Sequence, residues 1–423
     1  MNVLVLGAGR SGKAAEKLLA RTGCDSVVLD GDMPLPEGRW AFAVASPGIP
    51  ADHPWIAECE RRNIPVSSEL ELGAAHFRGR MLAVTGSKGK SSVVKLVADT
   101  LNLAGRGAVA CGNYGKPLCE VVTDGGATEW AVAEVSSFQM EQTRIFRPEA
   151  AAMLNLQADH LDRHGDMFTY MTLKLALLRG MDGGLALLPA DFPVRDGIGR
   201  KTRLETFGPA DGPARADWRW SPGAVEGPGG FRATVAGSYF DNAVTGPHAA
   251  AACALMRAAG LGAEEISAGF AAFVPLPHRM EKVAERGGIV YIDDSKATSL
   301  AALAAGVAAA GRPVRLIAGG LPKGDDPDSV KVVLHSHAKK VYLIGRCAEK
   351  FADAWRDAVS VETCGDLETA FAAASRDADP GDAVLLSPGC ASFDQYKSYG
   401  ERGDAFKALA RALGGAAGTC KQG

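Results

Sequence analysis

Short runs of aliphatic and β-branched residues alternate along the chain with longer stretches in which apolar residues recur every three or four positions. The short runs are typical of buried strands, and stretches such as Ser91 to Ala104 predict amphipathic helices. Strands followed repeatedly by helices predict an α/β fold with parallel sheets, whose ligand sites lie at the carboxyl ends of the strands. The predicted strands are Val3–Leu6, Ser26–Leu29, Met81–Thr85, Trp130–Glu134, Ala151–Leu154, Leu185–Leu188, Ile289–Ile292, Val314–Ala318, Lys340–Ile344 and Ala383–Ser387.

Two places in this pattern predict domain boundaries. Arg78-Gly79-Arg80 stands just before a new strand, and Pro275-Leu276-Pro277 interrupts a helical pattern. The length of 423 residues is in keeping with two or three domains, at about 150 residues each. We therefore expect domains at 1–78, 79–276 and 277–423. The segment Pro209 to Gly230, rich in Gly and Pro, predicts an excursion of loop and short strands.

Composition narrows the class of protein. Lys plus Arg number 46 against 49 Asp plus Glu, so the basic surplus that coats nucleic-acid-binding proteins is missing. No apolar run reaches the roughly 18 residues of a membrane helix, and the first residues resemble a strand rather than a signal peptide. The nine cysteines are scattered, which argues against a disulfide framework or a zinc site. We expect a cytoplasmic protein with no membrane span and no nucleic-acid partner.

The strongest local signal is a phosphate-binding loop between the strand at Met81–Thr85 and the following helix. Backbone N–H groups of such a loop bind anionic oxygens, Lys90 would reach the β- and γ-phosphates, and the Ser91 hydroxyl would face Mg²⁺. Only two residues separate Gly86 from Gly89, where the usual motif has four, and an ordinary turn with a surface lysine is the alternative. The residues predicted to bind ATP here are Gly86, Ser87, Lys88, Gly89, Lys90, Ser91 and Ser92.

A second glycine-rich turn, Gly7-Ala-Gly9-Arg10-Ser11-Gly12, follows the first strand, and Asp30 ends the second. This pattern is formally a dinucleotide fingerprint. A full dinucleotide domain has two halves, yet the next phosphate loop begins by residue 86 and leaves room for one. We therefore favour a nucleotide-diphosphate substrate, with NAD or FAD and a purely structural turn as alternatives.

Several polar residues at strand ends are candidates for the chemistry. Glu134 ends a strand beside the phosphate loop, where a magnesium ligand belongs. His160 lies in the polar cluster Asn155 to His164; taken alone, a surface or helix-capping histidine is favoured. Lys174, on its residues alone, predicts a solvated helix face. Asp293 to Thr298 predicts a polar active-site rim, with an acidic helix cap as the alternative.

These motifs together resemble the Mur ligases, the ATP-dependent amide-forming enzymes of peptidoglycan synthesis. The resemblance runs from Gly7 to about Phe406 and is thinnest between Asp182 and Pro247. Two segments resemble the glutamate-adding branch, Glu134–Gln139 and Ser387–Gln395. Further matching stretches are Ser46–Pro50, Gly112–Gly115, Asp159–Arg163, His278–Glu281, Asp294–Thr298 and Gly319-Gly320 with Lys323.

The resemblance implies a Rossmann-like N-terminal domain for a UDP-sugar, a central ATPase domain with a parallel sheet, and a Rossmann-like C-terminal domain. ATP would phosphorylate the carboxylate of UDP-N-acetylmuramoyl-L-alanine, and the amine of glutamate would attack the acyl phosphate. D-glutamate is expected, and a branch that adds L-glutamate is the alternative. Rivals from other classes are a nicotinamide-dependent oxidoreductase and a nucleotide-binding module without catalysis. A neighbouring rival with the same ATP chemistry is a folylpolyglutamate synthase. We expect a monomer.

The resemblance also implies roles for single residues. The catalytic residues are Lys90, His160, Lys174 and Lys296. Two Mg²⁺ ions would be held by Ser91 and Glu134 and by His160, with a carbamylated Lys174 as a further ligand. The additional ATP contacts are Asn113, Arg279 and Asp294. The residues implied for the UDP substrate are Gly9, Arg10, Ser11, Asp30 and Ser136, and those for glutamate are Thr298, Lys323, Ser392 and Tyr399.

Some positions depart from the family pattern. Lys88 stands where many members have Asn, which adds a cation beside the phosphates. Ala249 and Ala252 stand where Asn is usual, which removes a side-chain contact to adenine. Tyr399 replaces a common Phe and adds a hydroxyl to the glutamate site.

Overall fold

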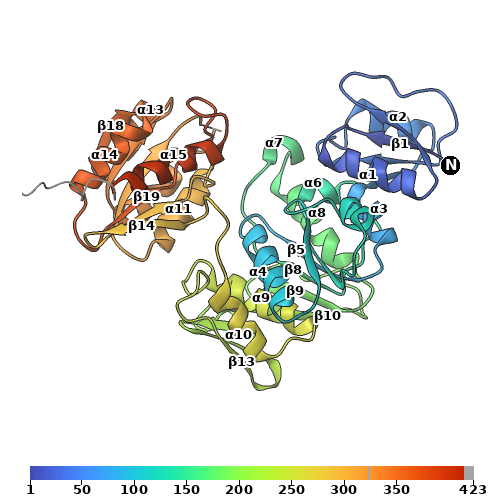
Figure 1. Cartoon of the computed structure of the whole chain (residues 1–423), viewed down its shortest axis with the longest axis horizontal. Coiled ribbons are helices and arrows are strands. Elements are labelled where there is room, and N and C mark those ends of the chain that lie inside the picture. Colours follow the sequence, from blue (N-terminus) through green and yellow to red (C-terminus); the bar gives the residue numbers. More distant parts are fainter. Residues whose placement is uncertain (323, 414–423) are drawn as a thin grey trace, which may run out of the picture. The chain divides into compact units, whose positions relative to one another are not determined.

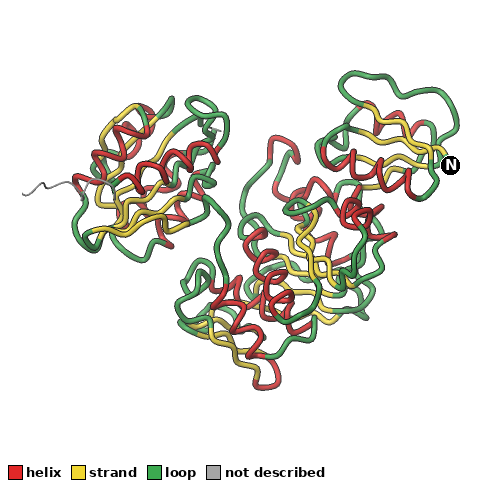
Figure 2. Tube along the Cα trace, viewed as in Figure 1, coloured by secondary structure: helices red, strands yellow, loops and turns green. Residues whose placement is uncertain are grey.

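The computed structural model describes residues 1–322 and 324–413 and divides the chain into two compact units, Met1–Phe273 and Val274–Gly423. In each unit, helices pack on sheets made mostly of parallel strands (Figure 1), and Figure 2 shows helix and strand alternating along the chain. The predicted α/β fold is confirmed. Within the described residues, we find no helix with the length and apolar character needed to cross a membrane.

The first sheet has four parallel strands in the order β2-β1-β3-β4. One face packs against α1 and the other against α2. Gly12 lets α1 approach the turn after β1, because a Cβ there would lie 1.8 Å from the Gly7 carbonyl oxygen. The elements are β1 (Asn2–Leu6), α1 (Arg10–Arg21), β2 (Asp25–Leu29), β3 (Phe42–Ala45), α2 (Pro54–Arg61), β4 (Val66–Ser68) and α3 (Glu69–His76).

The second sheet has nine strands in the order β13-β12-β11-β10-β9-β8-β5-β7-β6, parallel from β6 to β11 and antiparallel at β12 and β13. Successive residues of β5 face opposite cores: Leu82 packs on the side of α4, α9 and α10, and Ala83 on the side of α5 and α8. Helices therefore cover both faces, as a parallel sheet requires.

The strands of the second sheet are β5 (Arg80–Thr85), β6 (Ala108–Gly112), β7 (Trp130–Glu134), β8 (Ala150–Met153), β9 (Leu185–Pro189), β10 (Arg203–Pro209), β11 (Trp218–Ser221), β12 (Ala224–Gly227) and β13 (Phe231–Thr234). Its helices are α4 (Lys90–Leu103), α5 (Leu118–Asp124), α6 (Ser137–Met140), α7 (Leu161–His164), α8 (Met167–Arg179), α9 (Gly246–Ala258) and α10 (Ala263–Ala272), with a short 3₁₀ turn at Pro228–Gly230.

The unit from Val274 onward has one sheet in the order β14-β15-β19-β16-β17-β18, in which β14 runs antiparallel to β15 and the other pairs are parallel. Helices α11 to α13 pack on one face, and α14 and α15 on the other. The strands are β14 (Glu281–Arg286), β15 (Ile289–Asp293), β16 (Val314–Gly319), β17 (Ala338–Ile344), β18 (Val361–Gly365) and β19 (Ala383–Leu386). The helices are α11 (Leu300–Ala309), α12 (Lys331–His337), α13 (Ala348–Trp355), α14 (Leu367–Asp377) and α15 (Tyr399–Ala412), and a 3₁₀ turn spans Pro327–Val330.

All ten predicted strands are present, with ends that differ by at most two residues. The excursion predicted from Pro209 to Gly230 is confirmed as the short strands β11 and β12 and the 3₁₀ turn. The main omissions are short strands, such as β6 with its small residues AVACG and β18 with its mixed sequence VETCG. The division between the units falls between Phe273 and Val274, and the first two sheets share one unit. The domain limits at residues 78 and 276 stay predictions.

Buried carboxylates join the first sheet to the second within the Met1–Phe273 unit. Glu69, in α3, accepts the N–H of Cys119 in the first turn of α5 at 2.7 Å. Glu71 accepts the N–H groups of Arg144 and Ile145. Burial raises the pKa of Glu69 from 4.5 to about 6, although the Cys119 N–H opposes the shift.

We predict that Glu69 makes stability depend on pH. Because its pKa is raised in the folded state, the stabilisation is complete below about pH 4.5 and is lost as the pH rises through about 6. A shift of this size corresponds to about 2 kcal/mol. Between pH 4.5 and 7, the unfolding free energy of the native protein should fall by up to that amount relative to Glu69→Gln, measured by urea denaturation. The exposed Glu16→Gln serves as control; identical pH profiles for native and Glu69→Gln proteins would contradict the assignment.

Candidate active site

The predicted phosphate loop joins β5 to α4 and is held by a side chain from the adjacent strand. Asn155 follows β8, which pairs with β5. Its Oδ1 accepts the N–H groups of Ser87 at 3.1 Å and Lys88 at 2.8 Å, and its Nδ2 donates to the Lys88 carbonyl at 3.0 Å. The loop therefore has a fixed shape before any ligand binds.

His248, in the first turn of α9, supports the other side of the loop. Asn155 Nδ2 lies 3.0 Å from His248 Nε2. Burial lowers the pKa of His248 to about 4, so the ring is neutral near pH 7 and its Nε2 accepts from the amide. The ring lies against Gly89, which has φ +84°, and a Cβ at Gly89 would come within 2.6 Å of it. Both the positive φ and the histidine require glycine here.

Three lysines crowd around the loop. Lys90 Nζ donates to the carbonyls of Gly86 at 2.8 Å and Ser87 at 3.0 Å, and Lys174 Nζ donates to the same Gly86 carbonyl at 2.8 Å. Lys88 Nζ pairs with Asp159 at 3.0 Å. Such a concentration of positive charge suits a polyanion such as a nucleoside triphosphate.

Lys174 has an unusual environment for an amine. It is 1% exposed, within α8, and its Nζ lies 4.5 Å from the centre of the Tyr170 ring. Burial first, and the Lys90 ammonium second, lower its pKa from 10.5 to about 7. The solvated helix face that the residues alone favoured is therefore wrong, because the helix turns this lysine toward the phosphate loop.

Glu134 supplies the best fit to a metal ion. It ends β7, and its side chain is buried. Its Oε1 accepts from Asn113 Nδ2 at 2.7 Å, whereas its Oε2 is buried with no hydrogen-bond partner among the described residues. A buried carboxylate oxygen without a donor is costly unless a cation binds it, and carboxylate oxygen is a preferred ligand of Mg²⁺. Ser91, in the first turn of α4, is buried as well.

His160 lies just before α7 with φ +56°, a left-handed conformation that is uncommon outside glycine. Its Nε2 is 3.8 Å from Asp159 Oδ1, and its ring meets Phe138 edge-on. Burial acts to raise the pKa of Asp159, but Lys88, with smaller contributions from His160 and Lys90, holds it below the ordinary value. The structure thus joins Lys88 to His160 through Asp159.

The residues predicted for the UDP substrate lie at the starts of two helices and at the end of a strand. Gly9 caps the N-terminus of α1, where Ser11 occupies the first turn, and Arg10 donates to the Gly115 carbonyl at 2.9 Å. Ser136 caps α6 in a capping box with Gln139. Asp30, the last residue predicted for the UDP substrate, directly follows β2 and is exposed.

In the unit from Val274 onward, Arg279 lies between two residues with left-handed backbones, His278 at φ +60° and Met280 at φ +48°. Hydrogen bonds hold this loop: the Met280 N–H donates to Asp294 at 3.2 Å, and the His278 carbonyl accepts the Lys296 N–H at 3.0 Å. Strain of this kind persists only where the surroundings enforce it, and it gathers at functional sites.

Asp294 is buried beside this loop. Its Oδ2 accepts from Ser387 Oγ at 2.8 Å, and Gly306 leaves it room, because a Cβ there would lie 2.6 Å from that oxygen. Burial raises the pKa of Asp294 to about 7. The carboxyl is therefore close to half-protonated at neutral pH and can donate or accept a hydrogen bond.

Lys296 and Tyr399, both predicted from the sequence, lie together. The Lys296 ammonium is 3.9 Å from the centre of the Tyr399 ring, and Ser295 Oγ donates to the Tyr399 carbonyl. Arg402 fixes this region, since its buried guanidinium donates to Ser295 and to the Cys390 carbonyl. Burial lowers the Arg402 pKa to about 10. Of the remaining glutamate candidates, Ser392 is buried, Thr298 is partly buried, and Lys323 lies outside the described residues.

One further cluster has the composition of a metal site. His278, Glu281 and Asp293 each place a ligand atom within 4.8 Å of the others. However, Lys407 Nζ lies 2.6 Å from Glu281 Oε2 and 4.0 Å from Asp293 Oδ2. An ammonium ion already neutralises these carboxylates, so we assign no metal to them.

Sequence reasoning did not select several residues that shape the site. Asn155 and Asp159 stand in the polar cluster after a strand, which was a usable signal. His248 follows Gly-Pro at a helix start, and Arg402 lies on an ordinary helix, where no local pattern marks it. Ala249 and Ala252 are fully buried in the core, so they offer no side chain to a purine.

Two family models match the chain: "Mur ligase middle domain" over residues 84–236 and "Mur ligase, glutamate ligase domain" over residues 278–390. A UDP-N-acetylmuramoylalanine--D-glutamate ligase of Nitratidesulfovibrio vulgaris is 35% identical over 438 residues, which cover 97% of this chain and 96% of that protein. The enzyme of the same name from Myxococcus xanthus is 34% identical over 451 residues, covering 97% and 98%.

Solved structures share the fold. MurF ligase from Thermotoga maritima in complex with ADP matches with a TM-score of 0.64 at 17% identity, covering 97% of this chain and 94% of that one. E. coli FolC in complex with DHPP and ADP matches with a TM-score of 0.60 at 17% identity, covering 81% and 93%. At this level of identity, the likeness concerns the fold alone.

We predict that Asn155→Ala weakens nucleotide binding. The change releases the Ser87 and Lys88 N–H groups and the contact to His248, so the loop loses its fixed shape. The dissociation constant for ADP, measured by calorimetry, should rise on the order of 100-fold, as for other misplaced binding groups.

The matched control is Asn102→Ala. Asn102 also bridges backbone groups, with hydrogen bonds to the Ala108 N–H and carbonyl, but it lies at the far end of α4. ADP should bind this variant as tightly as the native protein. Equal weakening in both variants would mean that Asn155 acts only on overall stability.

Proposed function

Because the chain belongs to the Mur ligase family, we propose that it joins D-glutamate to UDP-N-acetylmuramoyl-L-alanine at the expense of ATP. The family predicted from the sequence motifs is confirmed by these relatives. The observation that carries the proposal is the phosphate loop, with Lys90 and Lys174 on one carbonyl and, beside it, the Glu134 oxygen that has no hydrogen-bond partner among the described residues. That arrangement fits a site for phosphoryl transfer.

The proposed reaction has two steps. The alanyl carboxylate attacks the γ-phosphorus of ATP, which gives an acyl phosphate and ADP. The amine of glutamate then attacks the acyl carbon, and an amide forms as phosphate leaves and the amine loses a proton. The first step brings two anions together, so its transition state needs fixed positive charge. Lys90, whose ammonium lies on the loop carbonyls, and Lys88, which pairs with Asp159, would supply that charge.

We propose that Mg²⁺ binds at the carboxyl ends of β5 and β7, beside the phosphate loop. Ser91 and Glu134 would hold one ion, and His160 with a carbamylated Lys174 would hold another. Bound there, Mg²⁺ would neutralise phosphate oxygens and orient the phosphates. Carbamylation fits the lysine itself, since only a neutral amine adds CO₂ and the Lys174 pKa of about 7 leaves much of it neutral at physiological pH.

The second step falls to residues of the unit from Val274 onward. We propose that Arg279 and Asp294 contact ATP and that Lys296, Thr298, Lys323, Ser392 and Tyr399 surround glutamate. Asn113, whose side chain donates to Glu134, would contact ATP from the Met1–Phe273 unit. Turnover then requires the two units to close on one nucleotide, so we propose domain closure as part of the cycle.

The UDP portion of the substrate would bind at Gly9, Arg10, Ser11, Asp30 and Ser136. The start of α1 favours a diphosphate, because helix N-termini bind anions. We further propose a monomeric enzyme that works in the cytoplasm. The relatives that cover nearly the whole chain are D-glutamate ligases, which supports D-glutamate over L-glutamate and over a folate substrate. Neither an oxidoreductase nor a non-catalytic module has comparable support.

We predict phosphate release only with the complete set of ligase substrates. Given ATP, Mg²⁺ and UDP-N-acetylmuramoyl-L-alanine, the protein should liberate orthophosphate with D-glutamate and at most a trace with L-glutamate. A folate in place of the UDP-sugar should give none. Lys90→Met should lower kcat about 10³-fold, as expected for loss of a charge that stabilises the transition state.

Lys95→Met is the matched control, since Lys95 lies one turn further along α4 and pairs with Asp99. Its kcat should stay within a few-fold of the native value. Phosphate release with L-glutamate alone, or with a folate alone, would replace the proposed substrate by the corresponding alternative.

We predict that Lys174 carries CO₂ in a pH-dependent way. In protein equilibrated with ¹³C-bicarbonate, a carbamate carbonyl signal should grow between pH 6 and 8, because the amine becomes neutral as the pH passes its pKa of about 7. Lys174→Ala should lack the signal and be nearly inactive, with partial rescue by a small carboxylate such as acetate. Full activity of Lys174→Ala without any additive would refute the carbamate.

A further inference from the structure

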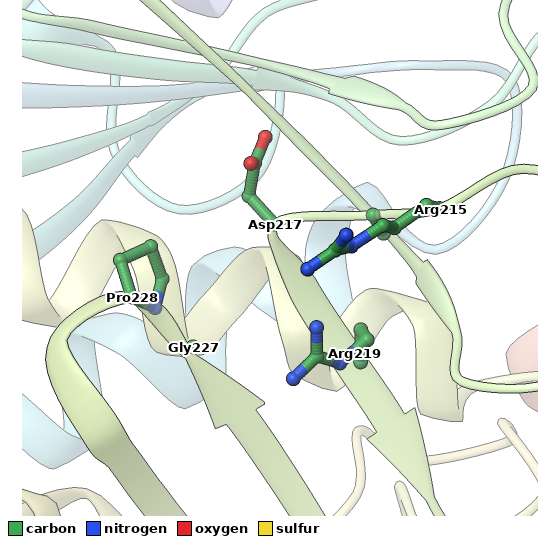
Figure 3. A pocket seen from close by; sticks show the side chains of 6 residues that line it. Arg215, Asp217, Arg219, Gly227 and Pro228 are labelled. Carbon is green, nitrogen blue, oxygen red and sulfur yellow. The ribbon is translucent and has the colours of Figure 1, made fainter.

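A pocket of about 350 Å³ lies on the β11–β12 hairpin, away from every residue placed in the ligase site. Its lining residues are Arg215, Ala216, Asp217, Arg219, Gly227 and Pro228. The strand β11 carries Arg219, and β12 ends at Gly227 (Figure 3).

Sheet topology separates this pocket from the phosphate loop. Strands β5, β8, β9, β10 and β11 are parallel, and the phosphate loop follows the carboxyl end of β5. The segment 215–217 precedes the amino end of β11, and Gly227 ends the antiparallel β12 at the same place. In the order β5-β8-β9-β10-β11, the strand β11 lies four strands from β5, so the pocket is roughly 19 Å along the sheet from the strand that carries the phosphate loop.

The pocket is positively charged. The guanidinium groups of Arg215 and Arg219 point toward the same space, while the Asp217 carboxylate points away from them (Figure 3). That carboxylate accepts the N–H and the hydroxyl of Thr206, both at 2.8 Å. Glu226 is the nearest counter-ion, at 3.5 Å from Arg219, and it also pairs with Arg232 at 2.5 Å. The hairpin thus carries three arginines and two carboxylates, Asp217 and Glu226, which leaves one positive charge in surplus.

The walls of the pocket are rigid. The buried Trp218 donates its indole N–H to Glu205 at 2.7 Å, and a Cβ at Gly227 would come within 2.5 Å of the indole ring. The Asp217 N–H donates to the Thr206 carbonyl at 3.1 Å, which fixes the segment that carries Arg215. A ligand would find the strands already in place, so little ordering entropy opposes binding.

We propose that this pocket is a second anion site, which binds a phosphate or diphosphate group of a small molecule independently of the ligase reaction. Two guanidinium groups that share one space match the oxygens of a phosphoryl group, with several charge-assisted hydrogen bonds in a fixed fork. A carboxylate offers two oxygens in one plane and engages one guanidinium fully, so a phosphoryl ligand makes better use of the pair.

The indole of Trp218 packs against Gly227, which lines the pocket, so its N–H signal serves as a probe of this site. In full-length protein labelled with ¹⁵N-tryptophan, we expect its N–H signal, assigned with Trp218→Phe, to shift during titration with inorganic pyrophosphate at 150 mM salt. Arg215→Ala/Arg219→Ala should raise the fitted dissociation constant at least tenfold. Arg215→Lys/Arg219→Lys keeps the charge but loses the fork and should give an intermediate value. An indole signal at its native position before titration shows that the hairpin of each variant is folded.

The matched control is Arg200→Ala/Lys201→Ala, which removes two positive charges from exposed positions of the same unit. It should change the constant less than twofold and, like the pocket variants, leave ligase turnover unchanged. The proposal is overturned if the indole does not shift, or if the two alanine pairs weaken binding equally, since attraction would then be a general effect of surface charge. Succinate binding as tightly as pyrophosphate would overturn the phosphoryl assignment.

Discussion

The hydrogen bonds from Asn155 to the phosphate loop are the constraint on which the rest of the site depends. They fix the Ser87 and Lys88 backbone from the neighbouring strand, and His248 closes the loop against Gly89. With the loop fixed, the carbonyl of Gly86 becomes the common acceptor for Lys90 and Lys174. Two neutral side chains, Asn155 and His248, therefore position the carbonyl that both lysines share, although neither takes part in the proposed reaction.

Burial then changes the protonation of the groups that this geometry brings together. A lysine in water would stay protonated, but Lys174 is desolvated beside a second ammonium, and its pKa falls to about 7. Glu134 ends the neighbouring strand with one oxygen held by Asn113 and the other without a donor in the part of the chain that the structure describes. The same low-dielectric surroundings thus favour a neutral amine and a bound cation within one site.

The unit from Val274 onward follows a different principle, because hydrogen bonds there hold a strained backbone loop in place. The left-handed residues on either side of Arg279 persist because Asp294 and Lys296 bind the loop on both sides. Arg402, buried without a carboxylate in hydrogen-bond contact among the described residues, ties the segments at Ser295 and Cys390 together. Arg402 acts only through the segments that it joins, which is why motif reading passed over it, whereas Arg279, Asp294 and Lys296 were predicted from their motifs.

The sequence by itself determined the α/β fold, the central strands and the phosphate loop, because period and glycine placement are local properties of the chain. It could not determine β6 or β18, whose pairing depends on neighbours distant in sequence. Tertiary structure alone decided that Lys174 is buried, that Asn155 and His248 hold the loop, and that Lys88 pairs with Asp159. These contacts join residues far apart in the chain, 93 positions in the case of Asn155 and His248, so no local pattern encodes them.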